Sequence, residues 1–155
     1  MGERVSVEAV EEYFRQKRTQ ARILIFQDTS TVAKAAESLG VEPGEIAKSL
    51  LFQTSEGLIM ILMAGDKRLD NRKYKAYFRT KAKMLDPRLV EEVTGHEVGG
   101  VCPFGLRTPL SVYLDKSLQG YTKVYPAAGA ANAAVELPVA ELAALTGGSW
   151  IDVAS

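Results

Sequence analysis

Two apolar runs near the middle of the chain, residues 46–54 and 58–64, are separated only by the turn-forming residues Ser55-Glu56-Gly57. Runs joined in this way predict an antiparallel hairpin. The second run is apolar at every position, so both of its faces need to be covered. We therefore expect this hairpin to lie at the centre of a sheet.

Five further segments have apolar residues at helical spacing, and each begins at a residue that can cap or start a helix. The expected helices begin at Ser6, at Thr29-Ser30-Thr31, at Asp70, at Asp86-Pro87 and at Pro138. The first is expected over about residues 6–18, and Gly40 ends the second. The third is a basic helix that ends near Phe78, with Tyr74, Tyr77 and Phe78 on its buried side.

Short runs of strand-forming residues lie between these helices. Further strands are expected at residues 23–26, 110–114, 123–125, 135–137 and 150–153. Strands in succession with unevenly placed helices indicate the α+β class. We expect a single domain over residues 1–155, in which helices pack on a mixed, largely antiparallel sheet or a barrel-like core.

Composition narrows the class of protein. A length of 155 residues fits one domain, and 46% hydrophobic with 25% charged residues is ordinary for a globular protein. The one cysteine excludes an internal disulfide, and the chain shows no apolar signal at its N-terminus, so we expect a cytoplasmic protein. The longest apolar run is too short to span a membrane.

Charge is unevenly distributed, although the formal net charge is zero. Residues 67–83 carry one acidic side chain, Asp70, and eight cationic ones. The cationic residues are Lys67, Arg68, Arg72, Lys73, Lys75, Arg79, Lys81 and Lys83. Such a block can attract a polyanion, and the alternative interpretation is a solvated helix face.

Residues 95–105 contain four glycines and Pro103. Glycine and proline disfavour helix interiors and central strands, so this segment is expected to be a shaped loop with exposed backbone N–H groups. Groups of this kind can hold a phosphate, a carboxylate or the oxyanion of a reacting ester. A structural turn without a ligand is the alternative.

The single histidine and the single cysteine lie in this loop. His96 and Cys102 could in principle form a thiolate–imidazole pair, which needs direct contact and a third orienting group. The commoner arrangement is a small apolar Cys102 whose backbone matters and a His96 on the loop surface. One cysteine and one histidine also disfavour a zinc site.

Lys48 is the most informative side chain of the hairpin. Strand alternation places it on the face of Ile46 and Leu50, where an ammonium group is costly unless it meets an anion or water. A structural salt bridge from Lys48 to Asp66 would satisfy this requirement.

Four segments in order carry a resemblance to a known family. They are IAKSLLF at 46–52, AGD at 64–66, GGVCPFGL at 99–106 and VYLD at 112–115. Together they resemble the YbaK/ProX family, the free-standing relatives of the editing domain inserted in bacterial prolyl-tRNA synthetases. The resemblance extends from about residue 29 to residue 153 and implies the fold of that family.

The resemblance implies hydrolysis of the ester that joins a wrong amino acid to tRNA, without a cofactor or a metal. The implied partner is aminoacyl-tRNA, with tRNA-Pro as the leading substrate and prolyl-tRNA synthetase as a further candidate partner. An ester needs a positioned water, a proton acceptor and donors for the oxyanion rather than a strong protein nucleophile. In relatives, the terminal ribose hydroxyl of the substrate is thought to assist proton transfer.

The same resemblance assigns roles to individual residues. It places Lys48 at the active site and assigns the loop that holds the aminoacyl group to Gly99, Gly100, Val101, Cys102 and Pro103. Gly100 and Val101 are the preferred backbone donors. The substrate-binding assignments are Thr31 and Val32 in the pocket wall, Asp66, Gly129 and Asn132. The tRNA-binding assignments are Lys67, Arg68, Arg72, Lys73 and Lys75.

One departure bears on the substrate. Family members that remove cysteine from tRNA-Pro carry a serine and an acid where this chain has Ala127 and Ala134. We therefore expect alanine, serine or 2-aminobutyrate to be removed rather than cysteine. Asn132, the one polar side chain of that turn, is either a substrate contact or a left-handed turn residue.

Two other functions remain open from the sequence. One is a module of the same fold that binds aminoacyl-tRNA or a synthetase without hydrolysing the ester. The other is a metabolic hydrolase whose small carboxylate substrate uses the same loop. Salt-sensitive binding to tRNA distinguishes the metabolic hydrolase from the other two, because phosphate contacts release counterions.

Overall fold

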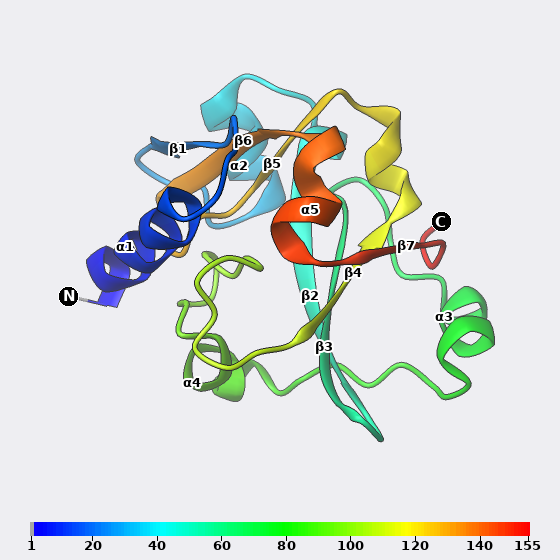
Figure 1. Ribbon diagram of the computed structural model, residues 1–155. Coiled ribbons are helices and arrows are strands. Elements are labelled where there is room, and N and C mark those ends of the chain that lie inside the picture. Colours follow the sequence, from blue (N-terminus) through cyan, green and yellow to red (C-terminus); the bar gives the residue numbers. More distant parts are fainter. Residues whose placement is uncertain (1) are drawn as a thin grey trace.

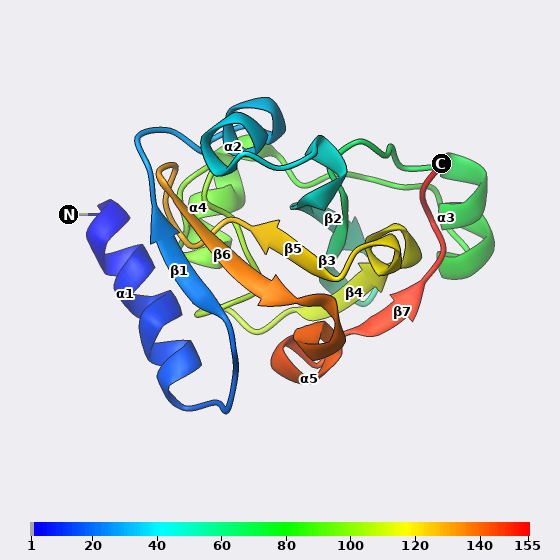
Figure 2. The same cartoon turned by 90° about the horizontal axis from the view of Figure 1, so that it is seen from above.

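The strands of the chain form one open sheet. The computed structural model describes residues 2–155, with side chains from residue 7 onward. The seven strands in this range follow the order β1-β6-β5-β2-β3-β4-β7 across the sheet (Figures 1 and 2). Their bounds are β1 (Arg22–Ile25), β2 (Ile46–Thr54), β3 (Gly57–Ala64), β4 (Ser111–Asp115), β5 (Lys123–Pro126), β6 (Ala133–Pro138) and β7 (Ser149–Ile151).

The predicted hairpin lies at the centre of this sheet. β2 and β3 pair antiparallel over eight residue pairs, from Ala47↔Ala64 to Thr54↔Gly57. The pairs β1–β6 and β5–β6 are also antiparallel, whereas β2–β5, β3–β4 and β4–β7 are parallel. The mixed sheet is therefore confirmed. The barrel-like core is not, because β1 and β7 end the sheet without pairing to each other.

The helices, together with the 3₁₀ turns that lead into the last two of them, begin close to the expected residues, with one exception. Their bounds are α1 (Gly2–Arg15), α2 (Val32–Leu39), α3 (Asn71–Phe78), α4 (Val90–Thr94) and α5 (Leu142–Thr146). Short 3₁₀ turns η1–η4 cover Pro43–Glu45, Pro87–Leu89, Lys116–Gly120 and Val139–Glu141. The exception is α1, which begins before Ser6 and ends before residue 18, so Ser6 lies inside it rather than at its start.

The predicted caps account for the positions of α2 and α3. The Thr31 side chain accepts a hydrogen bond from the amide of Lys34, and Gly40 ends α2 with a φ of 70°. The Asp70 side chain accepts from the amides of Arg72 and Lys73 at the start of α3. Both helices therefore start where a side-chain oxygen replaces a missing backbone acceptor.

Two layers of buried side chains cover the two faces of β3. Met60 and Leu62 face the larger core, in which Phe14 of α1 packs on Phe104 with ring centroids 4.7 Å apart. Ile61 faces the second core, which Tyr74 of α3 completes. The helices α1 and α3 lie at opposite ends of the molecule (Figures 1 and 2).

The expectation for Tyr77 is wrong. Its side chain is 49% exposed, whereas Phe78 packs on the buried Tyr74 as expected. Separately, no helix within residues 2–155 is both long and apolar enough to cross a membrane.

Candidate active site

A pocket of about 310 Å³ opens beside β2. The start of α2 forms one wall, and the glycine loop with the segment before α4 forms another. Of the residues predicted for the site, five line this pocket. They are Thr31, Val32, Lys48, Gly99 and Val101. Segments as far apart in the sequence as Thr29 and Ala134 thus meet in one cavity.

The remaining predicted residues are not among those that line the pocket. This second group consists of Asp66, Gly100, Cys102, Pro103, Gly129, Asn132, Lys67, Arg68, Arg72, Lys73 and Lys75. Several of them form hydrogen bonds that hold the pocket-lining segments in place.

The ammonium group of Lys48 is held by backbone oxygens. Lys48 Nζ donates to the carbonyl of Gly65 at 3.3 Å and to the carbonyl of Lys67. Among the described residues no ion pair joins Lys48 to Asp66, so the predicted salt bridge is not the contact that holds the lysine. An ammonium has three donors, and these two carbonyls leave one for a ligand.

Burial makes the charge of Lys48 costly. Desolvation lowers the pKa of Lys48 below its usual value, although the nearby charge of Asp66 opposes this shift. A partly desolvated cation attracts an anion or a polarised oxygen more strongly than a hydrated one. Lys48 is therefore suited to contact a carbonyl or phosphate oxygen in the pocket.

The glycine of the AGD segment, Gly65, has a structural reason. A β-carbon at this position would lie 2.4 Å from the carbonyl oxygen of Pro43 and 2.7 Å from the side chain of Val32. The absence of a side chain therefore lets α2 approach the end of β3. Val32 and Lys48 both line the pocket, and the Gly65 carbonyl accepts from Lys48 Nζ.

Gly100 joins the glycine loop to the turn that follows β5. Its amide donates to the carbonyl of Glu97 at 2.9 Å, and its carbonyl accepts from the amide of Gly129 at 2.8 Å. A β-carbon on Gly100 would lie 2.3 Å from the backbone nitrogen of Ala130. The Gly100 amide is therefore engaged within the protein, and the glycine is needed for packing.

The amides of Gly99 and Val101 are the available donors of this loop. None of the described residues accepts a hydrogen bond from either N–H group, and both residues line the pocket. Gly99 has a φ of 95°, a backbone conformation that favours glycine. The loop can therefore offer backbone donors to a ligand oxygen on its pocket side.

Cys102 and His96 form a buried structural contact. Both side chains are fully buried, so the expectation of a surface histidine is wrong. His96 Nε2 lies 2.7 Å from the carbonyl oxygen of Phe104 and 3.6 Å from Cys102 Sγ. Burial raises the pKa of the Cys102 thiol to about 12 and lowers the pKa of His96. Neither the protonation state nor the position suits Cys102 to act as a nucleophile.

The turn between β5 and β6 supplies an apolar wall. Ala127 and Ala134, which lies at the start of β6, both line the pocket. The family resemblance places the serine and the acid of cysteine-removing relatives at these two positions. Asn132 is not in the left-handed region, and its carbonyl accepts from the amide of Phe26 at 2.7 Å. The interpretation of Asn132 as a left-handed turn residue is therefore wrong.

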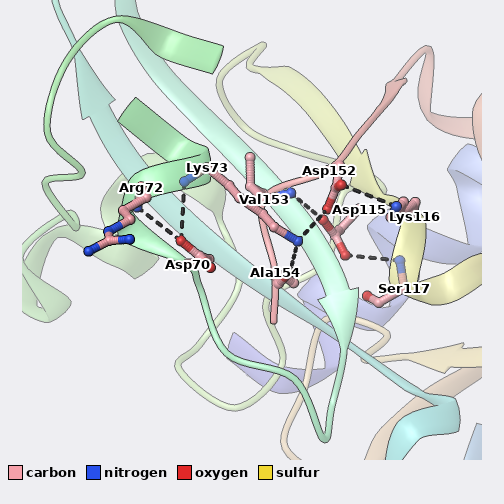
Figure 3. Close-up of polar contacts among 9 residues, drawn as sticks. All are labelled: Asp70, Arg72, Lys73, Asp115, Lys116, Ser117, Asp152, Val153 and Ala154. Atoms are coloured by element: carbon pink, nitrogen blue, oxygen red, sulfur yellow. Dashed lines mark hydrogen bonds and ion pairs between the residues drawn. The ribbon is translucent and has the colours of Figure 1, made fainter. Parts of the chain in front are cut away.

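The basic segment lies on and beside α3 rather than in the pocket. The side chains of Arg72 and Lys75 are exposed. Lys73 instead holds the C-terminal segment: its Nζ lies 3.1 Å from Asp152 and donates to the carbonyl of Ala154 at 2.9 Å (Figure 3). Asp152 also pairs with Lys116 at 3.1 Å.

Sequence reasoning missed two residues that matter for this geometry. Ser49 of β2 lines the pocket, and its hydroxyl is buried without a hydrogen-bond partner among the described residues. Glu97 accepts a hydrogen bond from the amide of Ala131 at 2.6 Å and so joins the loop to the turn. Ser49 belongs to the IAKSLLF segment, but no sequence signal indicates that its hydroxyl lacks a partner or that it lines the pocket.

The side chains described for residues 7–155 include no group of three histidine, cysteine, aspartate or glutamate residues that could hold a metal ion.

Comparison with known proteins agrees with this geometry. The chain is 44% identical over 152 residues to "Uncharacterized protein YwhH" of Bacillus subtilis (strain 168), covering 96% of this chain and 97% of the relative. It is 30% identical over 129 residues to "Putative Cys-tRNA(Pro)/Cys-tRNA(Cys) deacylase EbsC" of Enterococcus faecalis (strain ATCC 700802 / V583), covering 82% and 79%.

A solved structure and a family model extend the comparison. The structure described as "Crystal structure of a putative trans-editing enzyme for prolyl tRNA synthetase" superposes with a TM-score of 0.89 at 34% identity, covering 97% of each chain. The model of the aminoacyl-tRNA editing domain matches residues 27–145, which include every residue that lines the pocket. On this match, and on the full-length likeness to its relatives, the chain belongs to the aminoacyl-tRNA editing domain family.

Proposed function

We propose that this protein is a trans-acting deacylase that hydrolyses the ester of mischarged tRNA-Pro bearing a small amino acid. The observation that carries the proposal is one pocket whose lining includes Lys48, Val101 and an apolar wall. Membership of the editing-domain family supports an aminoacyl-tRNA substrate. The choice of tRNA-Pro rests on the prolyl-tRNA synthetase named for the similar structure, and that enzyme is a candidate partner.

The proposed reaction is attack of water on the ester carbonyl. The carbonyl oxygen gains negative charge in the tetrahedral intermediate, and backbone donors placed beforehand stabilise it. The N–H groups of Val101 and Gly99 and the remaining donor of Lys48 fill this role. Collapse of the intermediate breaks the ester bond and releases the free amino acid and the tRNA 3′ end, whose ribose oxygen receives a proton.

Proton transfer falls to the substrate in this proposal. Cys102 is a buried thiol with a pKa of about 12, and His96 is fully buried, so neither group is suited to receive the proton from the attacking water. A hydroxyl of the terminal ribose lies next to the ester in any aminoacyl-tRNA. Assistance by this hydroxyl, which the family resemblance implies, agrees with the absence of an accessible protein base among the pocket residues named above.

The walls of the pocket favour a small side chain. Ala127 and Ala134 contribute methyl groups to the lining, and Thr31 and Val32 also line it. The serine and the acid that the resemblance assigns to cysteine-removing relatives are missing here. Alanine, serine and 2-aminobutyrate are therefore the proposed amino acids. An editing pocket of this type discriminates best by excluding a larger residue.

The deciding experiment is a panel of tRNA-Pro samples charged with alanine, serine, 2-aminobutyrate, cysteine or proline, each followed for loss of the ester. We expect fast loss of the small residues, slower loss of cysteine and a stable prolyl ester. Lys123→Ala, which changes an exposed lysine of β5, is the control for Lys48→Ala. Salt-sensitive binding without hydrolysis of any ester would replace the deacylase by a binding module, and absence of binding would favour the metabolic hydrolase.

A further inference from the structure

The outer edge of β2 is paired on both sides of Ser49 but not at Ser49. On one side, Ala47 pairs with Pro126 of β5. On the other side, the carbonyl of Leu51 accepts from the amide of Leu85 at 3.0 Å, and the amide of Gln53 donates to the carbonyl of Lys83 at 2.8 Å. The edge of β2 that points away from β3 therefore changes its pairing partner within a few residues.

The backbone N–H and C=O groups of Ser49 point to the same edge of β2 as those of Leu51 and Gln53. In an antiparallel ladder, the backbone N–H and C=O groups of successive residues point alternately to the two edges of a strand. Because Leu51 and Gln53 point away from β3, Ser49 does so too. None of the described residues pairs with its N–H or C=O group. The backbone N–H and C=O groups of Ser49 are thus left without a hydrogen-bond partner among the described residues.

The open position coincides with the pocket. Ser49 lines the cavity together with Ala127, where β5 has ended, and Leu85, where the next pairing begins. The hydroxyl of Ser49 is also buried without a partner. Buried polar groups are normally hydrogen-bonded, so an unpaired donor, acceptor and hydroxyl at one residue indicate a site for a polar ligand.

We infer that the aminoacyl group of the substrate fills this gap as a single added strand residue. An aminoacyl ester carries an amino donor and a carbonyl acceptor on one α-carbon, in the same relation as the N–H and C=O groups of a residue. The α-amino group donates to the Ser49 carbonyl, and the ester carbonyl accepts from the Ser49 amide. This inference rests on the proposed function and names the residue that orients its substrate.

The arrangement separates two tasks. The edge of β2 recognises the amino and carbonyl groups that all aminoacyl esters share, as in the recognition of peptides by strand addition. The walls formed by α2 and the β5–β6 turn then select the side chain. A carbonyl oxygen has two lone pairs, so it can accept from Ser49 and from a loop amide together.

Amide hydrogen exchange measured by NMR tests this contact directly. The probe is 3′-deoxy-3′-(L-alanylamino)adenosine, in which a stable amide replaces the ester. At saturation we expect at least a tenfold slower exchange of the Ser49 amide, while the Gln53 amide, already bonded to Lys83, changes little. The analogue with a propanoyl group, which lacks the amine, is expected to bind roughly 10-fold more weakly. Unchanged Ser49 exchange, or equal binding of the two probes, overturns the inference.

Backbone substitution provides a second test. Replacing Ser49 by its α-hydroxy acid counterpart removes only the N–H group and should slow deacylation of alanyl-tRNA-Pro at least tenfold. The same replacement at Ser55, in the exposed hairpin turn, is the matched control and should leave the rate unchanged.

The outcomes distinguish the two proposals. If the protein deacylates tRNA but the Ser49 amide does not respond, the strand-addition contact is wrong and the proposed function stands. If no charged tRNA is deacylated but the alanylamino probe protects Ser49, the aminoacyl contact stands and the catalytic proposal fails.

Discussion

The carbonyl of Gly100 accepts a hydrogen bond from the amide of Gly129 at 2.8 Å, and this bond ties the glycine loop to the turn between β5 and β6. Glu97 adds a second tie through the amide of Ala131. The two segments that bear Val101 and Ala127 are thereby fixed relative to each other.

Gly100→Ala is expected to destabilise the protein. The added β-carbon would lie 2.3 Å from the backbone nitrogen of Ala130, which has no flexible side chain to move aside. Overpacking of this kind typically costs about 1–3 kcal/mol in the free energy of unfolding. Urea denaturation measures the change. Gly120→Ala is the control, because a β-carbon at Gly120 meets nothing within 4 Å; equal stability of the two variants would contradict the close packing at Gly100.

Lys48→Met is expected to slow deacylation by roughly 100-fold, which is typical for the loss of one group that stabilises an oxyanion. The variant should nevertheless be no less stable than the original protein, because it removes a charge that is partly desolvated. Single-turnover rates and urea denaturation measure the two effects. A variant that loses stability and activity together would indicate a structural role for Lys48.

The pKa of Lys48 predicts a pH dependence of stability. Burial lowers this pKa below the ordinary value of 10.5, so the unfolded chain binds the proton more tightly than the folded protein does. The free-energy cost of keeping Lys48 charged in the folded protein is fully present below its pKa in the folded state. This cost is relieved as the pH rises from there towards 10.5. We expect Lys48→Met to show a smaller rise in stability over this range than the original protein, measured by urea denaturation at several pH values. Identical pH profiles would show that the Lys48 pKa is not lowered.

Local sequence signals predicted much of the fold. The hairpin and the caps at Thr31 and Asp70 involve residues within a few positions of one another, so short-range chemistry determines them. Whether a sheet closes into a barrel depends instead on whether its two edge strands pair with each other, and no local sequence pattern contains that information. The barrel-like core was therefore wrong although nearly every strand was placed correctly.

The site was predictable to the same extent. Lys48 and Val101 belong to recognisable segments, and both line the pocket. The Gly100 amide donates to Glu97 within the same loop, but the Gly100 carbonyl accepts from Gly129, which is 29 positions away in the sequence. The burial of His96 depends on how the loop folds over Phe104. The open edge at Ser49 exists only because β5 and the segment 83–85 pair with β2 on either side of it.

Ala127→Ser is expected to shift the amino acid preference towards cysteine. Ala127 lines the pocket at the position where cysteine-removing relatives carry serine, and the change adds a hydroxyl to an apolar wall. We expect the ratio of cysteinyl to alanyl ester hydrolysis to rise about tenfold, within the range that single pocket contacts provide. Competition between the two charged tRNAs measures the ratio. The matched control is Ala144→Ser on the exposed face of α5, and an equal ratio in both variants would remove Ala127 from the specificity wall.

The cationic residues of α3 are expected to divide into two classes. Arg72 and Lys75 are exposed, so replacing either with alanine should weaken binding of uncharged tRNA and make the salt dependence shallower, by about 0.7–0.9 for each phosphate that is no longer neutralised. Lys73 holds Asp152 and the carbonyl of Ala154, so Lys73→Ala should loosen the C-terminal segment, with a smaller effect on the salt dependence. Filter binding at several salt concentrations measures the first effect, and hydrogen exchange of residues 152–155 measures the second. If Arg72→Ala and Lys75→Ala leave the salt dependence unchanged, α3 is a solvated helix face and the tRNA binds elsewhere on the protein.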